Sequence, residues 1–303
     1  GEGSAAAFSE CHADICAELA KYLREQQSRV EYNQNAQKIA AAFSRMNKII
    51  EPFPEQERIV LDAIYSTHKN ENRVFNFICF NYTDTLDKCI ETMKKKNADA
   101  LGKHAVGNMI FNHSIGTLCH VHGTIEKEMV FGVNDDTQIA KNEIFDCTNG
   151  DIYKNLLIKQ NANASYQENT DFKAAKILNS SHIVYIYGMS IGITDKLWWE
   201  RVCKWLAASN DHHLIVQKYT MPAKGVFPVK YQISEREYRN QIAQYGNYDE
   251  KTRKAIESRI HITNDNVFEE MKNIVPTSEE RERTEKVRFD EEIQQFVREL
   301  AQV

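Results

Sequence analysis

Hydrophobic residues recur every three or four positions through the first part of the chain, which is the spacing of an amphipathic helix. This pattern predicts two helices between Phe8 and Met46. After an interruption by prolines, it predicts a third helix from about Glu55 to Tyr65. We set aside residues 1–4, together with the alanines at 5–7, as a remnant of an expression tag. Residues 1–70 are therefore expected to form a helical lobe.

From Val74 onward the pattern changes to short apolar runs, which are typical of strands buried on both faces of a parallel sheet. Because helical patterns lie between most of these runs, the sequence predicts an α/β fold with a mainly parallel sheet. Residues 71–265 are expected to form this core, and residues 266–303 a charged helical segment. The predicted strands are 74–80, 117–122, 128–132, 182–187, 213–219 and 259–263, and the predicted helices between them are 84–95, 172–178 and 195–208.

Two intervals show no clear period. The polar interval 96–114 is interpreted as a connection, and residues 160–171, rich in Asn, Gln and Ser, as an exposed loop or lid. Trp198 and Trp199 are adjacent on a predicted helix, so they are assigned to its buried and its exposed side. His212 and His213 open a predicted strand and are expected to face solvent.

Three of the predicted strands break into small and polar residues at their carboxyl ends. Parallel strands end at the same edge of a sheet, and ligands of α/β proteins bind in the crevice at that edge. We therefore expect these three ends to form one ligand crevice. The residues concerned are Asn81 and Thr83, His122 and Gly123, and Gly188 and Ser190.

Composition and charge limit the classes of function. The chain has 303 residues, and its formal net charge of -5 gives no basic face for nucleic acid, so a nucleic-acid partner is not expected. The seven cysteines include no Cys-x-x-Cys pair, which favours a reducing compartment and argues against a zinc site. With no signal-peptide pattern and no apolar run long enough to span a bilayer, we expect a cytoplasmic protein without a membrane partner.

Four short motifs occur in a recognisable order along residues 74–206. They are Phe80-Asn81-Tyr82-Thr83, His120-Val121-His122-Gly123, Phe131-Gly132-Val133-Asn134, and Tyr187-Gly188-Met189-Ser190 followed by Asp195. Together they make the chain resemble the phage abortive-infection family AbiH, whose members are related to the sirtuin-like domains of bacterial defence proteins. The resemblance implies a Rossmann-like, sirtuin-like fold with a pocket for NAD.

The resemblance also implies roles for individual residues. Asn81 matches the asparagine that contacts the nicotinamide ribose, and His122 matches the histidine that acts as a base toward ribose hydroxyls. Gly188 and Ser190 match the turn along the adenosine side, and Asp195 is typical of the AbiH version, where it can cap the next helix. The predicted nucleotide-binding residues are Thr83, Gly123, Gly188, Ser190 and Asp195.

The residue types suit such chemistry on physical grounds. Loss of nicotinamide from NAD gives the ribose oxocarbenium character, and a neutral histidine can accept a hydroxyl proton as that charge develops. An asparagine offers a donor and an acceptor that orient the sugar or an attacking water. Glycines let the backbone approach a sugar or phosphate closely. His122 and Asn81 are therefore the candidate catalytic residues.

The chain departs from the AbiH pattern in two ways. Members of the family generally begin with a strand and a Gly-Asn-Gly-Phe-Asp phosphate-binding turn, which nothing in this sequence matches. We expect either a shortened chain or a nucleotide pocket without that turn. A four-cysteine zinc module is also missing, so neither zinc nor protein deacetylation is expected.

Each candidate also has another interpretation. His122 can be a satisfied core histidine, Asn81 can end a strand by bonding its own backbone, and Ser190 can be a helix N-cap. His120 and His122 form a His-x-His pair of the kind that chelates metal. Ser190 stands in a Gly-x-Ser-x-Gly sequence, which keeps a serine hydrolase as a further alternative.

The sequence thus predicts a phage-defence protein whose crevice binds NAD and hydrolyses it. The alternative is a non-catalytic nucleotide sensor or a protein-interaction module of a defence system. A nucleotide ligand and a phage or host protein trigger are the expected partners, and assembly into a homo-oligomer is left open.

Overall fold

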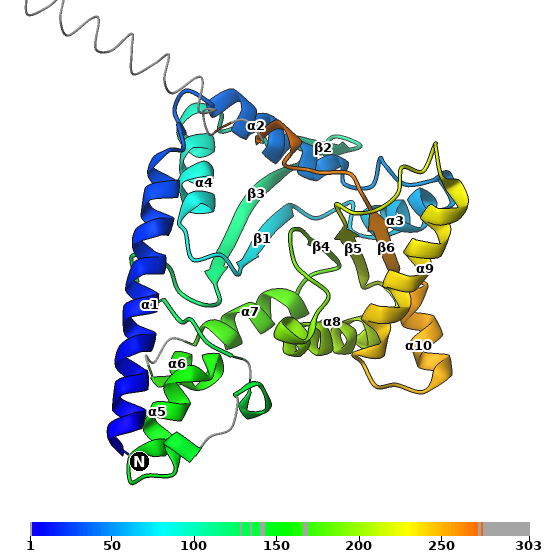
Figure 1. Ribbon diagram of the computed structural model, residues 1–303. Coiled ribbons are helices and arrows are strands. Elements are labelled where there is room, and N and C mark those ends of the chain that lie inside the picture. Colours follow the sequence, from blue (N-terminus) through cyan, green and yellow to red (C-terminus); the bar gives the residue numbers. More distant parts are fainter. Residues whose placement is uncertain are drawn as a thin grey trace, which may run out of the picture.

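The computed structural model describes residues 2–127, 129–133, 135–139, 143–165, 169–271 and 274, and it shows a mixed α/β fold (Figure 1). The α-helices are α1 (Glu2–Ser28), α2 (Ala36–Arg45), α3 (Glu55–Thr67), α4 (Thr85–Lys96), α5 (Gly150–Leu157), α6 (Lys159–Ser165), α7 (Thr170–Asn179), α8 (Lys196–Ala208), α9 (Pro228–Gln244) and α10 (Glu250–Glu257). The strands are β1 (Arg73–Cys79), β2 (Lys103–Val106), β3 (Met109–His120), β4 (Ile183–Ile186), β5 (His213–Gln217) and β6 (Ile260–Thr263).

The strands form two sheets of three strands each. In the first sheet, of order β1-β3-β2, β1 and β3 are parallel and β2 pairs antiparallel with β3. The second sheet, of order β4-β5-β6, is parallel throughout. Figure 1 shows β3, β1, β4, β5 and β6 following one another across the molecule. The strand pairing is therefore mainly parallel, but it is divided between two sheets.

Helices cover both faces of the first sheet. On one face α2 and α4 join the strands in a hydrophobic cluster, in which the Phe43 and Phe77 rings meet edge to face at 6.2 Å. On the other face Ile177 of α7 and Trp198 of α8 pack with Cys119 of β3. Successive residues of a strand point to opposite faces, so the continuous apolar runs of the sequence serve both layers.

The second sheet is covered in the same way. Ile242 of α9 and Ile256 of α10 share a cluster with Leu214 of β5. The next residue of the strand, Ile215, packs on the opposite face with Leu61 of α3. All five residues of β5 and all four of β6 are buried. The buried set includes polar side chains, which are His213, Gln217, His261 and Thr263.

The long helix α1 runs beside α5 (Figure 1). Ala5 is 0% exposed and packs with Phe145 and Leu157, and His12 Nε2 lies 3.0 Å from the Phe131 carbonyl oxygen. Ala5, one of the residues set aside from the fold prediction, is therefore part of a packed cluster.

The strand predicted at 117–122 starts earlier than expected. β3 begins at Met109 and forms a hairpin with β2, whose turn contains Gly107 at a φ of 58°. A positive φ of this size favours glycine. Interpreting 96–114 as a connection was wrong, because β2 and the first half of β3 are strands in which half-buried positions largely alternate with exposed ones.

Two other predictions on this side of the molecule are wrong. Residues 129–132 of the strand predicted at 128–132 form no strand, and an added Cβ on Gly132 would lie 2.1 Å from the Leu157 carbonyl oxygen. Residues 160–171, predicted as a loop or lid, contain most of α6 and the start of α7. Residues 166–168 and nearly all of the segment predicted at 266–303 beyond residue 271 lie outside the described residues.

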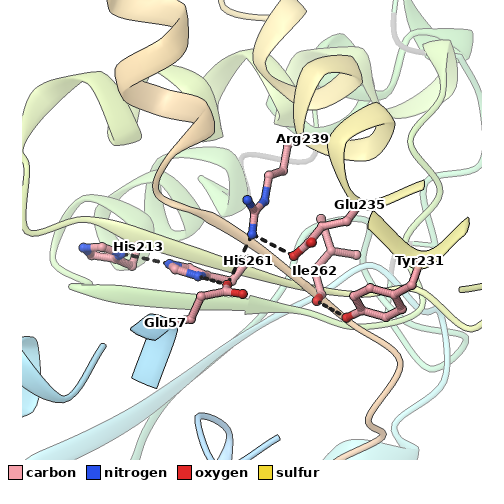
Figure 2. A network of polar contacts seen from close by, with 7 residues as sticks. All are labelled: Glu57, His213, Tyr231, Glu235, Arg239, His261 and Ile262. Carbon is pink, nitrogen blue, oxygen red and sulfur yellow. Dashed lines mark hydrogen bonds and ion pairs between the residues drawn. The ribbon is translucent and has the colours of Figure 1, made fainter. Parts of the chain in front are cut away.

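His213 is buried, contrary to the prediction that it faces solvent. It is 3% exposed, and its Nδ1–H donates to His261 Nε2 at 3.1 Å (Figure 2). His261 Nδ1–H donates in turn to Glu57 Oε2 at 2.8 Å. Arg239 of α9 donates to Glu57 at 3.2 Å and to Glu235 at 2.7 Å. This polar network joins α3 and α9 to β5 and β6.

The aromatic residues near α8 also differ from their prediction. Trp198 and Trp199 are 6% and 0% exposed, since α8 packs against hydrophobic clusters on more than one side. His212 is half-buried, with its ring stacked on Trp205 at 4.6 Å. A single buried face was therefore too simple a description of this helix.

Candidate crevice at the strand ends

The carboxyl ends of β1, β3 and β4 lie at the same side of the molecule. β1 and β3 end together because they are parallel neighbours in register, with Cys79 opposite His120. The Phe80 ring, just after β1, packs edge to face on Trp198 at 5.1 Å. Trp199, the next residue of α8, donates from Nε1 to the Ser190 carbonyl oxygen at 3.0 Å. The start of α8 thus touches the segments that follow both β1 and β4.

A cavity of about 1020 Å³ lies between β1 and β4. Five of the residues predicted from the sequence line it, and they come from the segments after the two strands. The cavity therefore brings together the two strand ends that the sequence places far apart. The five residues are Asn81, Thr83, Gly188, Ser190 and Asp195.

The glycine-serine turn after β4 has an open, polar surface. Gly188 has a φ of 68°, and an added Cβ would meet no atom within 4 Å. Ser190 Oγ donates to Asp195 Oδ2 at 3.0 Å. Asp195 occupies the N-cap position of α8 without a side-chain cap hydrogen bond, so Ser190 is not the N-cap. The turn offers a hydroxyl and a carboxylate to the cavity.

His122 lies next to the cavity but is not among the described residues that line it, and the same holds for Gly123. The imidazole is 8% exposed, with the rings of Phe80 and Tyr82 at 5.7 and 6.4 Å. Burial lowers the pKa of His122 to about 3, and the charge of Lys159 acts in the same direction. Among the residues that the structure describes, none hydrogen-bonds to the buried Nδ1 of His122. A neutral ring is therefore held beside two aromatic side chains.

His120, two residues earlier, has the opposite electrostatic character. Its Nε2–H donates to Asp87 Oδ2 at 2.8 Å, and its Nδ1–H points to the Asn81 carbonyl oxygen at 3.4 Å. A hydrogen bond with the Cys79 thiol and the Asp87 carboxylate raise the pKa of His120 to about 9, against the effect of burial. His120 therefore carries a positive charge at neutral pH, whereas His122 does not.

The comparison with known proteins identifies a family. The family model of bacteriophage abortive infection AbiH matches residues 4–217. The chain belongs to the AbiH family. The matched range includes α1 to α3, so the leading helices belong to the family region together with the motifs. No curated protein and no solved structure matches the chain.

Two groups near the strand ends of this AbiH protein were missed in the sequence. Asp87 lies in the first turn of α4, and its link to His120 joins residues 33 positions apart, which no local pattern reveals. Lys159 begins α6, immediately before the interval 160–171 that was interpreted as a loop. Burial lowers the pKa of Lys159, and the Asp195 carboxylate opposes that shift. Lys159 thus lies close enough to both His122 and Asp195 for the charges to interact.

The alternative chemistries find little support in this AbiH protein. Among the described residues, no three His, Cys, Asp or Glu side chains come together as metal ligands, although His120 and His122 form a His-x-His pair. Ser190 donates to Asp195, and no histidine hydrogen-bonds to it within the described part of the chain. None of the described helices is both long and apolar enough to cross a membrane.

Proposed function

We propose that this AbiH-family protein acts in phage abortive infection by binding a nucleotide, NAD. The nucleotide would lie in the part of the cavity that follows the carboxyl ends of β1 and β4. The observation that carries the proposal is the common lining of that cavity by Asn81, Thr83, Gly188, Ser190 and Asp195. Ligand pockets are commonly about 300–1,000 Å³ in volume. A cavity of about 1020 Å³ gives such a ligand enough room.

The polar groups of the crevice suit a ribose. A carboxylate that accepts hydrogen bonds from ribose hydroxyls is a common element of dinucleotide recognition. Asp195, held by Ser190 at 3.0 Å, offers such an acceptor, and the exposed Asn81 offers an amide. Gly188 leaves the backbone accessible, since no atom lies within 4 Å of an added Cβ. These groups support contacts to the sugars.

The phosphates would meet a different environment. The sequence has no Gly-Asn-Gly-Phe-Asp turn, and Asp195 carries a negative charge into the crevice. The nearby cation is Lys159, which interacts with Asp195 and His122. We infer that Lys159, rather than a glycine-rich turn, offsets the phosphate charge of a bound nucleotide.

Hydrolysis of NAD is the finer part of the proposal, with His122 as the base and Asn81 as the group that orients the sugar. His122 Nδ1 supports it, because a buried nitrogen without a partner is free to accept a proton or a hydrogen bond from a ligand. Its pKa of about 3 keeps the ring neutral, as a base must be.

The same residue also favours the second candidate function, a nucleotide sensor without turnover. A base works best when its pKa lies near the working pH, and a pKa of about 3 is far below neutrality. Phe80 lines the cavity, whereas His122, whose ring lies 5.7 Å from the Phe80 ring, does not. Binding without chemistry fits these facts.

A finer description of the fold belongs with this proposal. We propose that the two sheets are parts of one Rossmann-like, sirtuin-like arrangement. The support is the parallel pairing of β1 with β3 and of β4, β5 and β6, with a polar crevice at the carboxyl ends.

Calorimetry with NAD and ADP-ribose, combined with an assay of nicotinamide release, separates the two functions. Binding with nicotinamide release supports hydrolysis, and binding without release supports the sensor. If neither ligand binds, the nucleotide proposal is wrong. Ser190→Ala is expected to weaken binding about tenfold, because Asp195 loses the hydrogen bond that holds it as an acceptor for the ribose. Ser258→Ala is the matched control, because Ser258 is an exposed serine far from Ser190 in the sequence.

A further inference from the structure

The segment that leads from β5 into α9 carries a dense group of exposed apolar side chains. Five of the twenty large hydrophobic residues that are exposed in the described part of the chain belong to it. Single exposed apolar residues are ordinary on protein surfaces, whereas a contiguous group marks an interaction site. The five are Tyr219, Val226, Phe227, Val229 and Ile233. Residues 218–233 are called the α9 tip below.

Four of these five side chains are close neighbours. Val226 and Phe227 come directly before α9, and Val229 and Ile233 are four residues apart, so they share one side of its first two turns. Every residue from 223 to 230 is exposed. An added Cβ on Gly225 would meet no atom within 4 Å, and Figure 1 shows this segment at an outer corner of the molecule. The α9 tip therefore projects into solvent.

Inward-pointing side chains anchor the α9 tip to the core. Met221 and Tyr231 are buried in the hydrophobic cluster that packs on β5 and β6. The Tyr231 hydroxyl donates to the Ile262 carbonyl oxygen at 3.1 Å (Figure 2). Thr220 Oγ1 lies 3.1 Å from the hydroxyl oxygen of Tyr238, which ties the start of the segment to the middle of α9. The backbone is thus fixed from below, and the exposed apolar residues are held outward.

The charged side chains of the α9 tip are all positive. Residues 212–234 include three lysines and no Asp or Glu, in a chain whose formal net charge is -5. The half-buried carboxylates of Glu57 and Glu235 interact with the charge of one of them, Lys224. Each lysine Nζ lies 5.1 or 5.2 Å from the centroid of an aromatic ring, in the pairs Lys218–Tyr238, Lys224–Tyr231 and Lys230–Phe227. The α9 tip therefore presents ammonium groups next to apolar side chains.

We propose that the α9 tip is a peripheral docking site for a bilayer surface that contains anionic phospholipids. Cationic side chains close to such a surface are attracted to its negative charge, and exposed apolar side chains enter the boundary between head groups and acyl chains. Val226, Phe227 and Val229 would enter that boundary, while the lysines stay at the level of the phosphates. The expectation of no membrane partner rested on the absence of a spanning run and of a leader pattern, and a peripheral contact requires neither.

The chemistry and size of the α9 tip favour a lipid surface over other partners. Single-stranded nucleic acid stacks its bases on aromatic rings, but Val226, Val229 and Ile233 have no ring. A stable protein interface takes roughly 20–30 residues from each side, which is more than the tip contains. Pockets for small ligands are concave, whereas the tip projects. A bilayer surface requires only a few inserted side chains with cations beside them.

Cosedimentation of the full 303-residue chain with lipid vesicles tests the proposal first. Vesicles of phosphatidylcholine with about one third phosphatidylserine should bind the chain at least roughly tenfold more strongly than vesicles of phosphatidylcholine alone, because each lysine near an anionic surface contributes about fivefold. Salt at about 0.5 M should remove most of the difference. Absence of binding, or equal binding to both kinds of vesicle, would overturn the proposal.

Two pairs of variants locate the contact. Phe227→Ser is expected to weaken binding to the anionic vesicles about tenfold, because the ring no longer enters the boundary. Phe172→Ser of α7 is its matched control, since Phe172 is the more exposed of the two, 71% against 50%, and lies outside the tip. Lys230→Gln should weaken binding about fivefold, and Lys94→Gln, at an exposed lysine of α4, should not. Equal effects within either pair would contradict docking through the α9 tip.

Phe227→Trp provides a direct reporter of insertion. The three native tryptophans are buried, so a blue shift of emission on adding anionic vesicles would come from the new indole, and Phe172→Trp should show none. A shift in Phe172→Trp alone would contradict the proposal. A shift of Phe227→Trp with a single-stranded oligonucleotide, and none with vesicles, would make the tip a nucleic-acid surface and overturn it. None of these experiments contains NAD or ADP-ribose, so their outcome is independent of the proposed nucleotide function.

Discussion

His120 and His122 follow one another at the end of β3 with opposite protonation. A strand would place both on one face, but β3 ends at His120, and the chain turns at Gly123 with a φ of 68°. His120 therefore reaches Asp87, while His122 is enclosed by Phe80 and Tyr82. The turn gives two neighbouring imidazoles different roles, one as a charged link to α4 and one as a neutral group beside the crevice.

The link between His120 and Asp87 predicts a specific pH dependence of stability. The pKa of His120 is raised in the folded protein, so the stabilisation is present below its ordinary value of 6.5 and is lost as the pH rises through about 9. Asp87→Asn is expected to lower the pKa of His120 and to cost about 1 kcal/mol of unfolding free energy at pH 6, a modest value because Asp87 is half-exposed.

Nuclear magnetic resonance titration and urea unfolding at pH 6 and pH 10 check this prediction. The loss should be present at pH 6 and small at pH 10. Glu71→Gln, which removes the similar contact of His68 with Glu71 at 3.0 Å, is the control and should leave the titration of His120 unchanged. A His120 pKa that does not move in Asp87→Asn would contradict the assignment.

The unsatisfied nitrogen of His122 predicts a conflict between stability and function. His122→Phe replaces a buried polar ring by an apolar one beside Phe80 and Tyr82. We expect the unfolding free energy to rise by about 1 kcal/mol, because the cost of the unpaired nitrogen disappears. Thermal unfolding measures this, and nucleotide binding or nicotinamide release should fall in the same variant. A destabilised variant would mean that His122 already has a partner in the folded protein.

Replacing two glycines of the family motifs by alanine is expected to lower the unfolding free energy by different amounts. An added Cβ on Gly132 would lie 2.1 Å from the Leu157 carbonyl oxygen, whereas one on Gly188 meets no atom within 4 Å. Gly188→Ala should cost only the left-handed backbone strain, about 1 kcal/mol. Gly132→Ala should cost about 3 kcal/mol of unfolding free energy, because the backbone at Gly132 or at Leu157 must move. Urea unfolding midpoints compare the two, and the reverse order would contradict the close packing at Gly132.

At the scale of elements, the chain Glu57–His261–His213 holds α3 to the second sheet. Burial lowers the pKa of His213 to about 4, with His261 and Arg259 acting in the same direction. Burial raises the pKa of the Glu57 carboxyl, but His261 and Arg239 outweigh it, so the net direction is down. Both groups therefore stabilise the fold at neutral pH, and both lose that contribution as the pH falls.

The network predicts that the unfolding free energy of the protein falls in acid. The unfolding free energy should fall between pH 6.5, the ordinary pKa of histidine, and pH 4, as the unfolded chain takes up a proton that buried His213 resists. His213→Gln should make that fall shallower, and His68→Gln, at a half-buried histidine outside this network, should not. Thermal melts from pH 4 to pH 7 provide the comparison, and equal slopes in His213→Gln and the unmodified chain would contradict the assignment.

The sequence predicts a strand best where its apolar run is continuous. β1 and β4 lie within one residue of the strands predicted at 74–80 and 182–187, because their apolar runs are continuous. The hairpin of β2 and β3 was missed because its positions alternate in a polar interval. His213 was misjudged because its partner, His261, is 48 residues away in sequence. The shared lining of the cavity by Asn81 and Ser190 depends on such long-range packing too.

At the scale of the whole molecule, a single cavity extends along β1 and β4. Its apolar part lies between the two strands, and its polar part follows their carboxyl ends. In the proposed function, the nucleotide fills the polar part.

Amide hydrogen exchange with and without ADP-ribose tests the nucleotide crevice. We expect ADP-ribose to slow exchange by about tenfold or more in the segments 80–85 and 188–196, which follow the carboxyl ends of β1 and β4, and to leave the amides within β1 and β4 unchanged. Exchange that stays the same throughout, or that slows only in other segments, would contradict a nucleotide crevice at this place.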